Sequence, residues 1–498
     1  MKTGLATVTP PDSAARFTAL LIASIFLTTA AFLMVNYGVN LVISLFGRDA
    51  VKEHVATAFK NGDLGLLESR ALDSDMGVHQ TNDCLIFDMA AREATELPLY
   101  LFAASATSQF EANGAERCEQ LRNWALEDPT TPSKEGIYYR YIHGYRIVAV
   151  ALLSVFSVVD ARLVMKLCSY SIFIALCLIN GLALYRRIKA SDRSRQSLGD
   201  VVAASNEMAY IGIGLSLLLV FGLPYFGQSI SHAPALVTLG VFLILWSRRD
   251  LRGELDLYRM TRMVIVFSLF TASFEFLTGY IPVACVLLCL LVGISDRKTR
   301  FGAPLPLFGR LVAVEFAFVA TLLVAFLLHL LFTTLFVGDL KVLVGFFAQL
   351  AFRMSQSRIS KASLATDDPG IPGLSLGEVI ERLLHQIPHI GVPDEFTGFA
   401  TLLIAFGIVL IGFGEIWLSN SDRDAKWRTL VIAAALIPLA MWILAFKNHT
   451  YVHARFMVRI LVSVYLTATV MSFWFYVVRR AAVSQSREAQ VTGRVLTS

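Results

Sequence analysis

The chain has 498 residues, of which 56% are hydrophobic and only 16% are charged. Soluble domains carry about 25% charged residues, so this composition, with a mean hydropathy of +0.62, excludes an ordinary soluble enzyme and predicts an integral membrane protein. The net charge of +5 comes from short basic clusters between apolar segments, and no continuous basic face is visible for nucleic acid. We therefore expect membrane lipid, and no nucleic acid, among the partners.

Apolar segments of membrane-spanning length recur along the chain, since a membrane helix needs about 20 mostly apolar residues. The N-terminal segment is too long for the apolar core of a cleavable signal peptide, so we expect it to remain as the first span. The pattern predicts an all-α polytopic membrane protein with about ten transmembrane helices. The predicted spans cover residues 19–46, 163–185, 208–226, 235–246, 263–276, a segment that ends near 294, 311–337, 399–418, 430–446 and 456–478.

Arginine and lysine gather in every second predicted loop, namely those after the second, fourth, sixth, eighth and tenth spans. Loops rich in these residues stay on the cytoplasmic side of a membrane. We therefore expect both termini in the cytoplasm and the remaining loops on the extracytoplasmic side.

Two long extracytoplasmic loops divide the predicted chain. The large loop between the first and second spans is expected to be helical, with one helix starting near Thr81 or Asn82, which are good N-caps, and another amphipathic stretch over 115–126. The apolar stretch 148–159 is too short to span a membrane and is expected to lie along its surface or dip into it. The expected units are 1–46 (N-terminus and first span), 47–145 (large loop domain), 146–337 (interfacial helix and spans two to seven), 338–398 (second loop) and 399–498 (spans eight to ten and tail).

Two of the six cysteines, Cys84 and Cys118, lie in the large loop. They can form a disulfide if the loop faces an oxidising compartment, but the sequence contains no distance between them and leaves the pairing open. The other cysteines lie in apolar segments, as small buried hydrophobes do. No Cys-x-x-Cys or histidine-rich cluster indicates a metal site.

Acidic side chains are concentrated in the large loop and at one span end. Asp83 lies at the predicted helix start, where a carboxylate is favoured by the helix dipole even without a catalytic role. Asp75 belongs to an acidic stretch that also has an ordinary explanation as a solvated loop. Glu275 lies at the outer end of the fifth predicted span, where a carboxylate costs free energy unless it is paired or faces water.

Basic and amide side chains gather at two other extracytoplasmic places. Arg140 and His143 lie among tyrosines, which is typical either of interfacial anchors or of a ligand site. The short turn before the last predicted span contains a set that can hold a phosphate by charge-assisted hydrogen bonds. This set is Asn448, His449, His453 and Arg455, with the two histidines spaced i, i+4; two histidines without a nearby acid are weak evidence for a metal.

Three segments resemble the GT-C class of glycosyltransferases of the kind linked to bacterial surface polysaccharides. They are Thr81-Asn82-Asp83-Cys84-Leu85-Ile86, Arg140-Tyr141-Ile142-His143-Gly144-Tyr145-Arg146 and Asn448-His449-Thr450-Tyr451-Val452-His453. The resemblance also covers the topology of most of the chain. It implies hexosyl or pentosyl transfer from a polyprenyl-phosphate-linked sugar donor to a glycan, lipid or protein acceptor, on the outer face of a bacterial inner (plasma) membrane, in envelope glycan synthesis. No cofactor is expected, although a divalent metal is compatible with the reaction.

The resemblance also implies a catalytic carboxylate in the first outer loop, which corresponds best to Asp83 and next to Asp75. This carboxylate would act as the general base on the acceptor hydroxyl. The substrate-binding candidates for the phosphate or the sugar are Arg140, His143, Glu275, Asn448, His449, His453 and Arg455. The chain departs from the family in lacking an Asp-x-Asp directly after the first span, where Asp49 stands alone.

Three alternatives fit the same membrane frame. A polysaccharide polymerase or ligase would use the same class of donor. A lipid-linked-sugar transporter or flippase is the second, but we find no paired repeats with broken helices of the kind that transporters show, and a large outer loop favours an enzyme. A non-catalytic assembly scaffold is the third, and composition does not separate it from the others.

Overall fold

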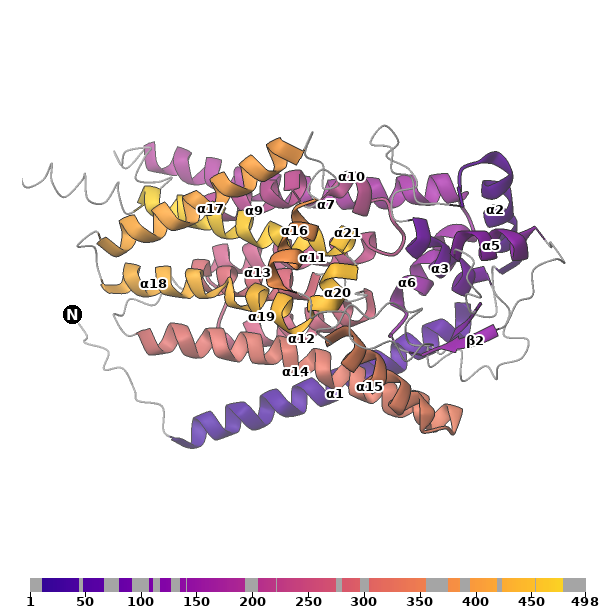
Figure 1. The fold of residues 1–498 in the computed structure, drawn as a ribbon. Coiled ribbons are helices and arrows are strands. Elements are labelled where there is room, and N and C mark those ends of the chain that lie inside the picture. The colour runs from indigo at the N-terminus through magenta and orange to yellow at the C-terminus, as the bar shows by residue number, and fades with distance from the viewer. Residues whose placement is uncertain are drawn as a thin grey trace, which may run out of the picture.

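We describe the protein from a computed structural model, whose ribbon is shown in Figure 1. The structure describes residues 11–43, 48–66, 80–91, 107–110, 117–126, 135–139, 141–192, 205–220, 222–274, 280–295, 304–354, 375–385, 395–418, 423–452 and 454–477. Within these ranges the regular secondary structure is helical apart from one two-stranded antiparallel ribbon, β1 (Thr107–Phe110) with β2 (Glu135–Tyr138). This ribbon is a departure from the all-α expectation, and its strands are too short to produce a readable alternation of apolar and polar residues.

Among the described residues, five helices are long and apolar enough to cross a membrane, which confirms a helical protein with several membrane-compatible spans. They belong to the segments expected as spans one, two, seven, eight and ten. Four of them are α1 (Pro11–Ile43), α7 (Val158–Asp192), α14 (Pro304–Val337) and α17 (Glu395–Leu418), and the fifth is the helical stretch Val458–Val477, whose first turn is the 3-10 helix η4 (Val458–Leu461).

Helices also occupy the other five predicted spans, although these helices are shorter, interrupted or more charged. Their apolar lengths alone do not establish a crossing, so the count of ten spans stays a prediction. They are α9 (Asn206–Val220), α11 (Ala233–Arg252), α12 (Leu257–Phe274), α13 (Tyr280–Ser295) and the pair α18 (Arg423–Ala434) and α19 (Ile437–Ala445).

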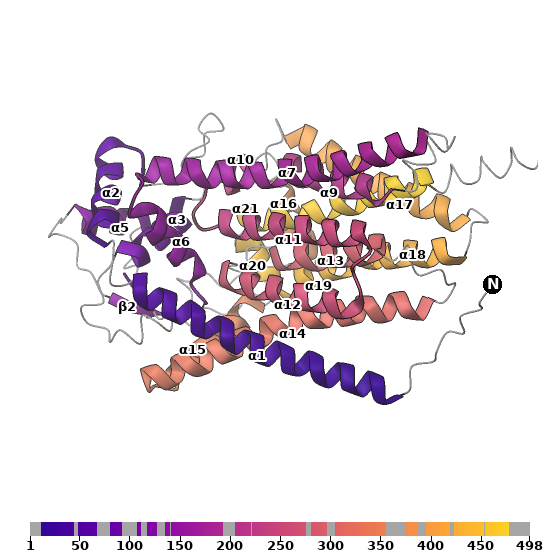
Figure 2. The same cartoon turned by 180° about the vertical axis from the view of Figure 1, so that it is seen from behind.

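The long helices run side by side as a bundle, and a group of shorter elements is gathered at one end of it (Figure 1). We call this group the end domain. It consists of α2 (Arg48–Asn61), α3 (Gln80–Ala91), α5 (Arg117–Ala125), α6 (Gly144–Leu153) and the β-ribbon. The view from behind shows α1 lying along α12 and α14, with its N-terminal end pointing away from the end domain (Figure 2).

Short helices complete the bundle between its long members. A capping box, in which the Ser375 hydroxyl and the Glu378 carboxylate bond each other's backbone N–H groups, starts α16 (Leu376–Leu384). This helix packs against α20 (Lys447–Val452) and α21 (Ala454–Met457), while α15 (Lys341–Met354) packs against α14 and α20.

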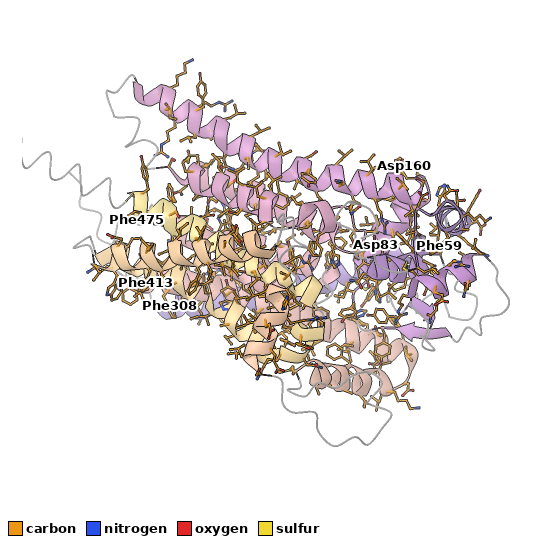
Figure 3. The ribbon with its side chains drawn as sticks, turned by 45° about the horizontal axis from the view of Figure 1, so that its top comes forward. Phe59, Asp83, Asp160, Phe308, Phe413 and Phe475 are labelled. Carbon is orange, nitrogen blue, oxygen red and sulfur yellow. A yellow bond between two sulfur atoms is a disulfide. The ribbon has the colours of Figure 1, made fainter. Side chains whose placement is uncertain are left out.

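The molecule has two hydrophobic cores, one in the bundle and one in the end domain. Helix α7 contributes to both, since Phe173 and Leu176 lie in the bundle core while Ala161 and Met165 lie in the end-domain core. Its 35 residues correspond to about 52 Å, well beyond the roughly 30 Å of membrane hydrocarbon. Figure 3 shows Asp160, at the start of α7, at the same end as Phe59 and Asp83, with Phe308, Phe413 and Phe475 toward the other end.

Helix α6 occupies the first part of the apolar stretch that was too short to span a membrane. Its residues Tyr145, Ala149 and Leu153 are buried in the end-domain core. The helix therefore packs against protein on this face, and its expected position along the membrane surface stays a prediction. The described helix also ends at Leu153, earlier than the expected limit.

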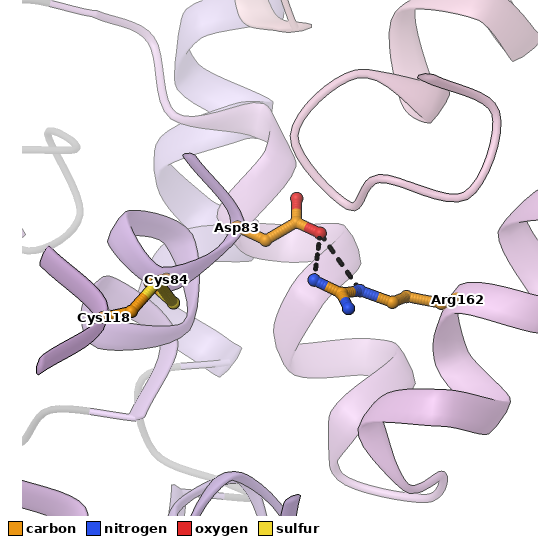
Figure 4. Close-up of a disulfide and its surroundings, with 4 residues drawn as sticks. All are labelled: Asp83, Cys84, Cys118 and Arg162. Atoms are coloured by element: carbon orange, nitrogen blue, oxygen red, sulfur yellow. Dashed lines mark hydrogen bonds and ion pairs between the residues drawn. A yellow bond between two sulfur atoms is a disulfide. The ribbon is translucent and has the colours of Figure 1, made fainter. Parts of the chain in front are cut away.

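A disulfide joins Cys84 of α3 to Cys118 of α5, with a Cα–Cα distance of 5.2 Å and a sequence separation of 34 residues. Both cysteines are buried in the end-domain core. The bond answers the pairing question that the sequence left open, and it joins two of the helices that form this small core (Figure 4).

Replacing both Cys84 and Cys118 with Ser should lower the free energy of unfolding by about 2–4 kcal/mol, because the unfolded chain loses a cross-link. Denaturant unfolding in detergent micelles measures this change, with Cys168→Ser, an exposed free cysteine, as the matched control. A thiol count on denatured, unreduced protein should give 4 free cysteines. A count of 6 would contradict the bond.

Candidate functional site

Asp83, the predicted catalytic carboxylate, lies in the first turn of α3 and forms an ion pair with Arg162 of α7. Arg162 donates hydrogen bonds from Nε and Nη2 to Asp83 Oδ2 at 3.2 and 2.9 Å. The exposed fractions of the two side chains are only 1% and 0%. Removing one member of a buried ion pair costs about 3–5 kcal/mol, because the remaining charge is left without compensation. The pair therefore fixes the end domain to the longest helix of the bundle.

The other oxygen of Asp83 is bound by the connection between α9 and α11. Ser229 Oγ donates to Asp83 Oδ1 at 2.7 Å, and the backbone N–H of Ser231 donates to the same oxygen at 3.1 Å. The carboxylate thus accepts four hydrogen bonds from two elements and has no exposed oxygen. Figure 4 shows the side chain directed toward Arg162, on the opposite side of α3 from the disulfide.

The connection that supplies these serines is a compact turn over residues 222–232. Gly222 has a φ of 72°, a left-handed conformation that glycine adopts without strain, and it precedes the single helical turn α10 (Leu223–Phe226). A Cβ on Gly227 would lie 2.5 Å from Leu223 O, so this position also requires glycine. Sequence reasoning missed the turn as a functional element; the available signal was its cluster of polar residues, Gln228, Ser229, Ser231 and His232, between two apolar helices.

His232 lies near Asn82 of α3 and near Arg459, a residue close to the start of the last long helix. Asn82 Nδ2 lies 3.4 Å from His232 Nε2, so the amide donates and Nε2 accepts. The ring is buried, and this burial, followed by the nearby Arg459 guanidinium, lowers the pKa of His232 well below its usual 6.5. His232 is therefore neutral at physiological pH, and it faces a permanent cation.

Arg459 lies in η4, at the start of the last long helix, and its side chain is fully buried. Its guanidinium carbon lies 4.4 Å from the centre of the Phe226 ring, a cation–π contact worth about 2 kcal/mol when it is desolvated. Arg459 follows the predicted Asn448–Arg455 turn, so the structure brings a cation from this part of the sequence next to the residues around Asp83.

Two further polar groups here have no hydrogen-bond partner among the described residues. They are the side-chain amide of Gln228, with both Nε2 and Oε1, and the Nη1 group of Arg162. Both side chains are 1% exposed. Buried polar groups are nearly always hydrogen-bonded, and a buried group left without a partner costs about 1–3 kcal/mol. These atoms therefore indicate a place where a polar ligand or water is expected.

We call this set of side chains the interface cluster, because it lies where the end domain meets the bundle. It contains a carboxylate, two arginines, a neutral histidine, two hydroxyls and two amides from α3, α7, the 222–232 turn and η4. Such a set offers donors for a phosphate or for sugar hydroxyls. Its members are Asn82, Asp83, Arg162, Gln228, Ser229, Ser231, His232 and Arg459.

His143, a predicted substrate-binding residue, is fully buried next to α6. Its Nε2 lies 2.8 Å from the carbonyl of Tyr138, which can only accept, so Nε2 carries the proton, and Nδ1 accepts a hydrogen bond from the Tyr145 hydroxyl. Burial is the main cause that lowers the pKa of His143 to about 3. The ring is thus a neutral structural group in this geometry, with both nitrogens occupied.

His329 of α14 makes a similar contact with Tyr139, the residue that follows β2. Its Nε2 donates to the carbonyl of Tyr139 at 3.0 Å, and its Nδ1 accepts from the Tyr37 hydroxyl of α1 at 3.0 Å. The segment that leaves β2 is therefore held by α6 on one side and by α1 and α14 on the other.

Arg146, in the same segment as His143, is buried and also structural. It donates from Nε to Met89 O at 2.9 Å and from Nη1 to Asn40 Oδ1 at 3.2 Å. It therefore joins α6 to α3 and to the end of α1.

The remaining predicted site residues are only partly visible. Asn448 and His449 are buried in α20, which packs against α15 and α16. Arg455 lies in α21, but its side chain is outside the described residues. Asp75, Arg140, Glu275 and His453 also lie outside the described residues. The assignment of these seven residues to one site with Asp83 stays a prediction. In the part of the chain that is described, no three His, Cys, Asp or Glu side chains are grouped as metal ligands are.

Comparisons with protein-family models, with curated proteins and with solved structures find no match to this chain. The resemblance to GT-C glycosyltransferases therefore remains a prediction from the sequence.

A double-mutant cycle tests the ion pair between the end domain and the bundle. Asp83→Ala and Arg162→Ala should each lower the free energy of unfolding by about 3–5 kcal/mol, because each leaves a buried charge without its partner. The double variant should lose clearly less than the sum of the two. Additive losses in denaturant unfolding would show that the two side chains do not interact.

His143 should make the folded protein less stable in acid. The unfolded chain takes up a proton near pH 6.5, whereas the folded chain binds one at His143 only near pH 3. Stability from this group is complete above pH 6.5 and falls by about 1.4 kcal/mol per pH unit below it, down to about pH 3. His143→Gln, which can keep both hydrogen bonds, should flatten the loss between pH 7 and pH 5. His385→Gln, an exposed control, should leave the pH dependence unchanged; equal slopes in all three proteins would contradict the assignment.

Proposed function

We propose that this chain is a membrane glycosyltransferase. It would transfer a sugar from a polyprenyl-phosphate-linked donor to a glycan, lipid or protein acceptor on the extracytoplasmic face of the membrane, in envelope glycan synthesis. The observation that carries this proposal is the interface cluster, since a buried set of cationic, hydroxyl and amide groups between an apolar bundle and a polar domain suits a substrate that is itself half lipid and half sugar.

The disulfide supports an extracytoplasmic position for the end domain, because disulfides persist in oxidising compartments. The distribution of basic residues agrees with this orientation. Basic residues lie near the ends of α7 and α11 that point away from the end domain, namely Arg187, Lys189, Arg249 and Arg252. Loops rich in such residues remain in the cytoplasm. We propose ten spans, cytoplasmic termini and a bacterial inner membrane.

In the proposed reaction the acceptor hydroxyl oxygen forms a bond to the anomeric carbon of the donor sugar, while the bond from that carbon to the phosphate oxygen breaks. The acceptor proton passes to Asp83, and the polyprenyl phosphate leaves with the electron pair. An acceptor hydroxyl can take the place of the Ser229 hydroxyl on Asp83 Oδ1, because both are O–H donors. Such an exchange brings the proton within reach of the base, as general base catalysis requires.

The phosphate side of the donor would be bound by Arg459, with the free Nη1 group of Arg162 and the Gln228 amide as further donors. Preorganised donors of this kind stabilise the charge that develops on a leaving group in a site with little water. The predicted residues Arg140, Glu275, Asn448, His449, His453 and Arg455 are proposed to complete the binding site, and the geometry of His143 favours a structural role for that residue.

The proposal is tested by incubating the purified protein with a panel of polyprenyl-phosphate and polyprenyl-diphosphate sugars and measuring the release of the lipid phosphate. Wild type should release it, and Asp83→Asn should lose activity by at least about 100-fold, the lower range for a general base, at a temperature where it is still folded. Asp160→Asn, at an exposed aspartate near the start of the same α7, should keep full activity.

Two other outcomes would replace the proposal. Transport of intact lipid-linked sugar into the other leaflet, without release of the phosphate, would identify a flippase. Repeated addition of sugar units to a growing polysaccharide would identify a polymerase or ligase. Full activity of a folded Asp83→Asn protein would remove the base while leaving the reaction class in place.

A further inference from the structure

A groove between α11 and α12 shares no lining residue with the interface cluster and has no part in the proposed reaction. It has a volume of about 860 Å³, within the range of roughly 300–1,000 Å³ that small-molecule sites occupy. One part of its lining is apolar and includes Val241, Leu245, Val266 and Phe270, each of which is 40–48% exposed. The other part contains Arg249, Arg259 and Arg262 together with Asp256 and Tyr258.

The floor of the groove is a packed aromatic pair. Phe242 of α11 and Phe267 of α12 stack with their ring centres 4.2 Å apart and an angle of 13° between the rings, and both are buried. Phe267 is also stacked on Phe318 of α14 at 5.8 Å. The floor is therefore part of the bundle core, and the groove above it is a preformed surface.

The length of the groove matches one leaflet of a membrane. Its lining on α11 runs from Val237 to Arg249, a separation of 12 residue steps, or about 18 Å along a helix. Half of the roughly 30 Å hydrocarbon thickness is about 15 Å. An acyl chain of one leaflet can therefore lie along the apolar part while its headgroup reaches the arginine end.

The arginine end carries positive charge that the neighbouring residues compensate only in part. Arg259 is paired with Asp256 at 3.6 Å and also donates to Glu254 O at 2.8 Å. Arg249 and Arg262 form no ion pair with a described residue; the Arg262 guanidinium lies 5.4 Å from the centre of the Tyr258 ring. Two cations thus line the end of an apolar groove, at the end of α11 opposite the end domain.

We infer that this groove is a binding site for an anionic phospholipid of the cytoplasmic leaflet. Its acyl chain lies over the Phe242–Phe267 floor, and its phosphodiester is held by Arg249 and Arg262. Basic pockets between helices at the cytoplasmic side are suited to anionic headgroups, and guanidinium groups bind phosphate oxygens by paired hydrogen bonds. A zwitterionic lipid would fill the apolar part but would bring no net charge to the arginines. The choice of leaflet rests on the proposed orientation, whereas the site itself does not depend on the proposed transferase activity.

The test uses the full-length protein in detergent and native mass spectrometry with dioleoyl phosphatidylglycerol or dioleoyl phosphatidylcholine. Wild type should bind the anionic lipid on the order of tenfold more tightly than the zwitterionic one. The double variant Arg249→Gln/Arg262→Gln should lose most of this preference, since each cation contributes to headgroup attraction. Its thermal midpoint without lipid shows whether the variant is folded.

Two controls separate a built site from general surface charge. Arg248→Gln/Arg252→Gln removes two exposed arginines from the same end of α11 that do not line the groove, and it should keep the preference. Leu245→Trp fills the apolar part with all arginines in place, and it should weaken binding. The inference is overturned if the two double variants show the same lipid preference, or if Leu245→Trp binds the anionic lipid as tightly as wild type does. It is also overturned if both lipids bind equally, or if polyprenyl phosphate binds while phosphatidylglycerol does not.

Discussion

The buried ion pair between Asp83 and Arg162 is the interaction on which the arrangement of the end domain depends. Two charges removed from water cost several kcal/mol each, and their attraction repays this cost only when the geometry is good and the remaining lone pairs are satisfied. Ser229 and Ser231 satisfy the second carboxylate oxygen. The 222–232 turn must therefore keep its shape for the pair to be stable, and α3 must keep its contact with α7. One carboxylate thus couples three parts of the chain that are far apart in sequence.

The same arrangement creates an enclosed polar region beside an apolar bundle. In surroundings of low polarity, hydrogen bonds and charge contacts are stronger than in water, and any unsatisfied group is correspondingly costly. Gln228 and the Nη1 group of Arg162 are such groups, so the region is more stable with a polar occupant than without one. The disulfide between α3 and α5 contributes by keeping the small end-domain core intact, and α3 is the helix that presents Asn82 and Asp83 to this region.

The sequence predicted the helices well because span-length apolar segments are a strong signal. A helix lies at each of the ten expected places, and α3 begins within two residues of its expected start. The environment of Asp83 was not predictable, since its partners Arg162, Ser229 and Ser231 lie 79, 146 and 148 residues away. His143 shows the same limit. Its position among tyrosines fits a substrate-binding residue at the surface, whereas the structure buries its ring. This burial depends on packing by α6 and by the segment after β2, which residue spacing alone does not predict.

Two histidines, His143 and His329, bind the carbonyl groups at the end of β2 and restrict how this segment can move. His143 and His329 bind consecutive carbonyl groups, those of Tyr138 and Tyr139, and successive residues of an extended chain face opposite ways. A shift of the strand by one residue would turn each carbonyl away from its imidazole and leave two buried N–H groups unpaired. The two hydrogen bonds thus favour one register of this segment relative to α6 and α14. A motion that slides this segment along its neighbours would therefore break both hydrogen bonds.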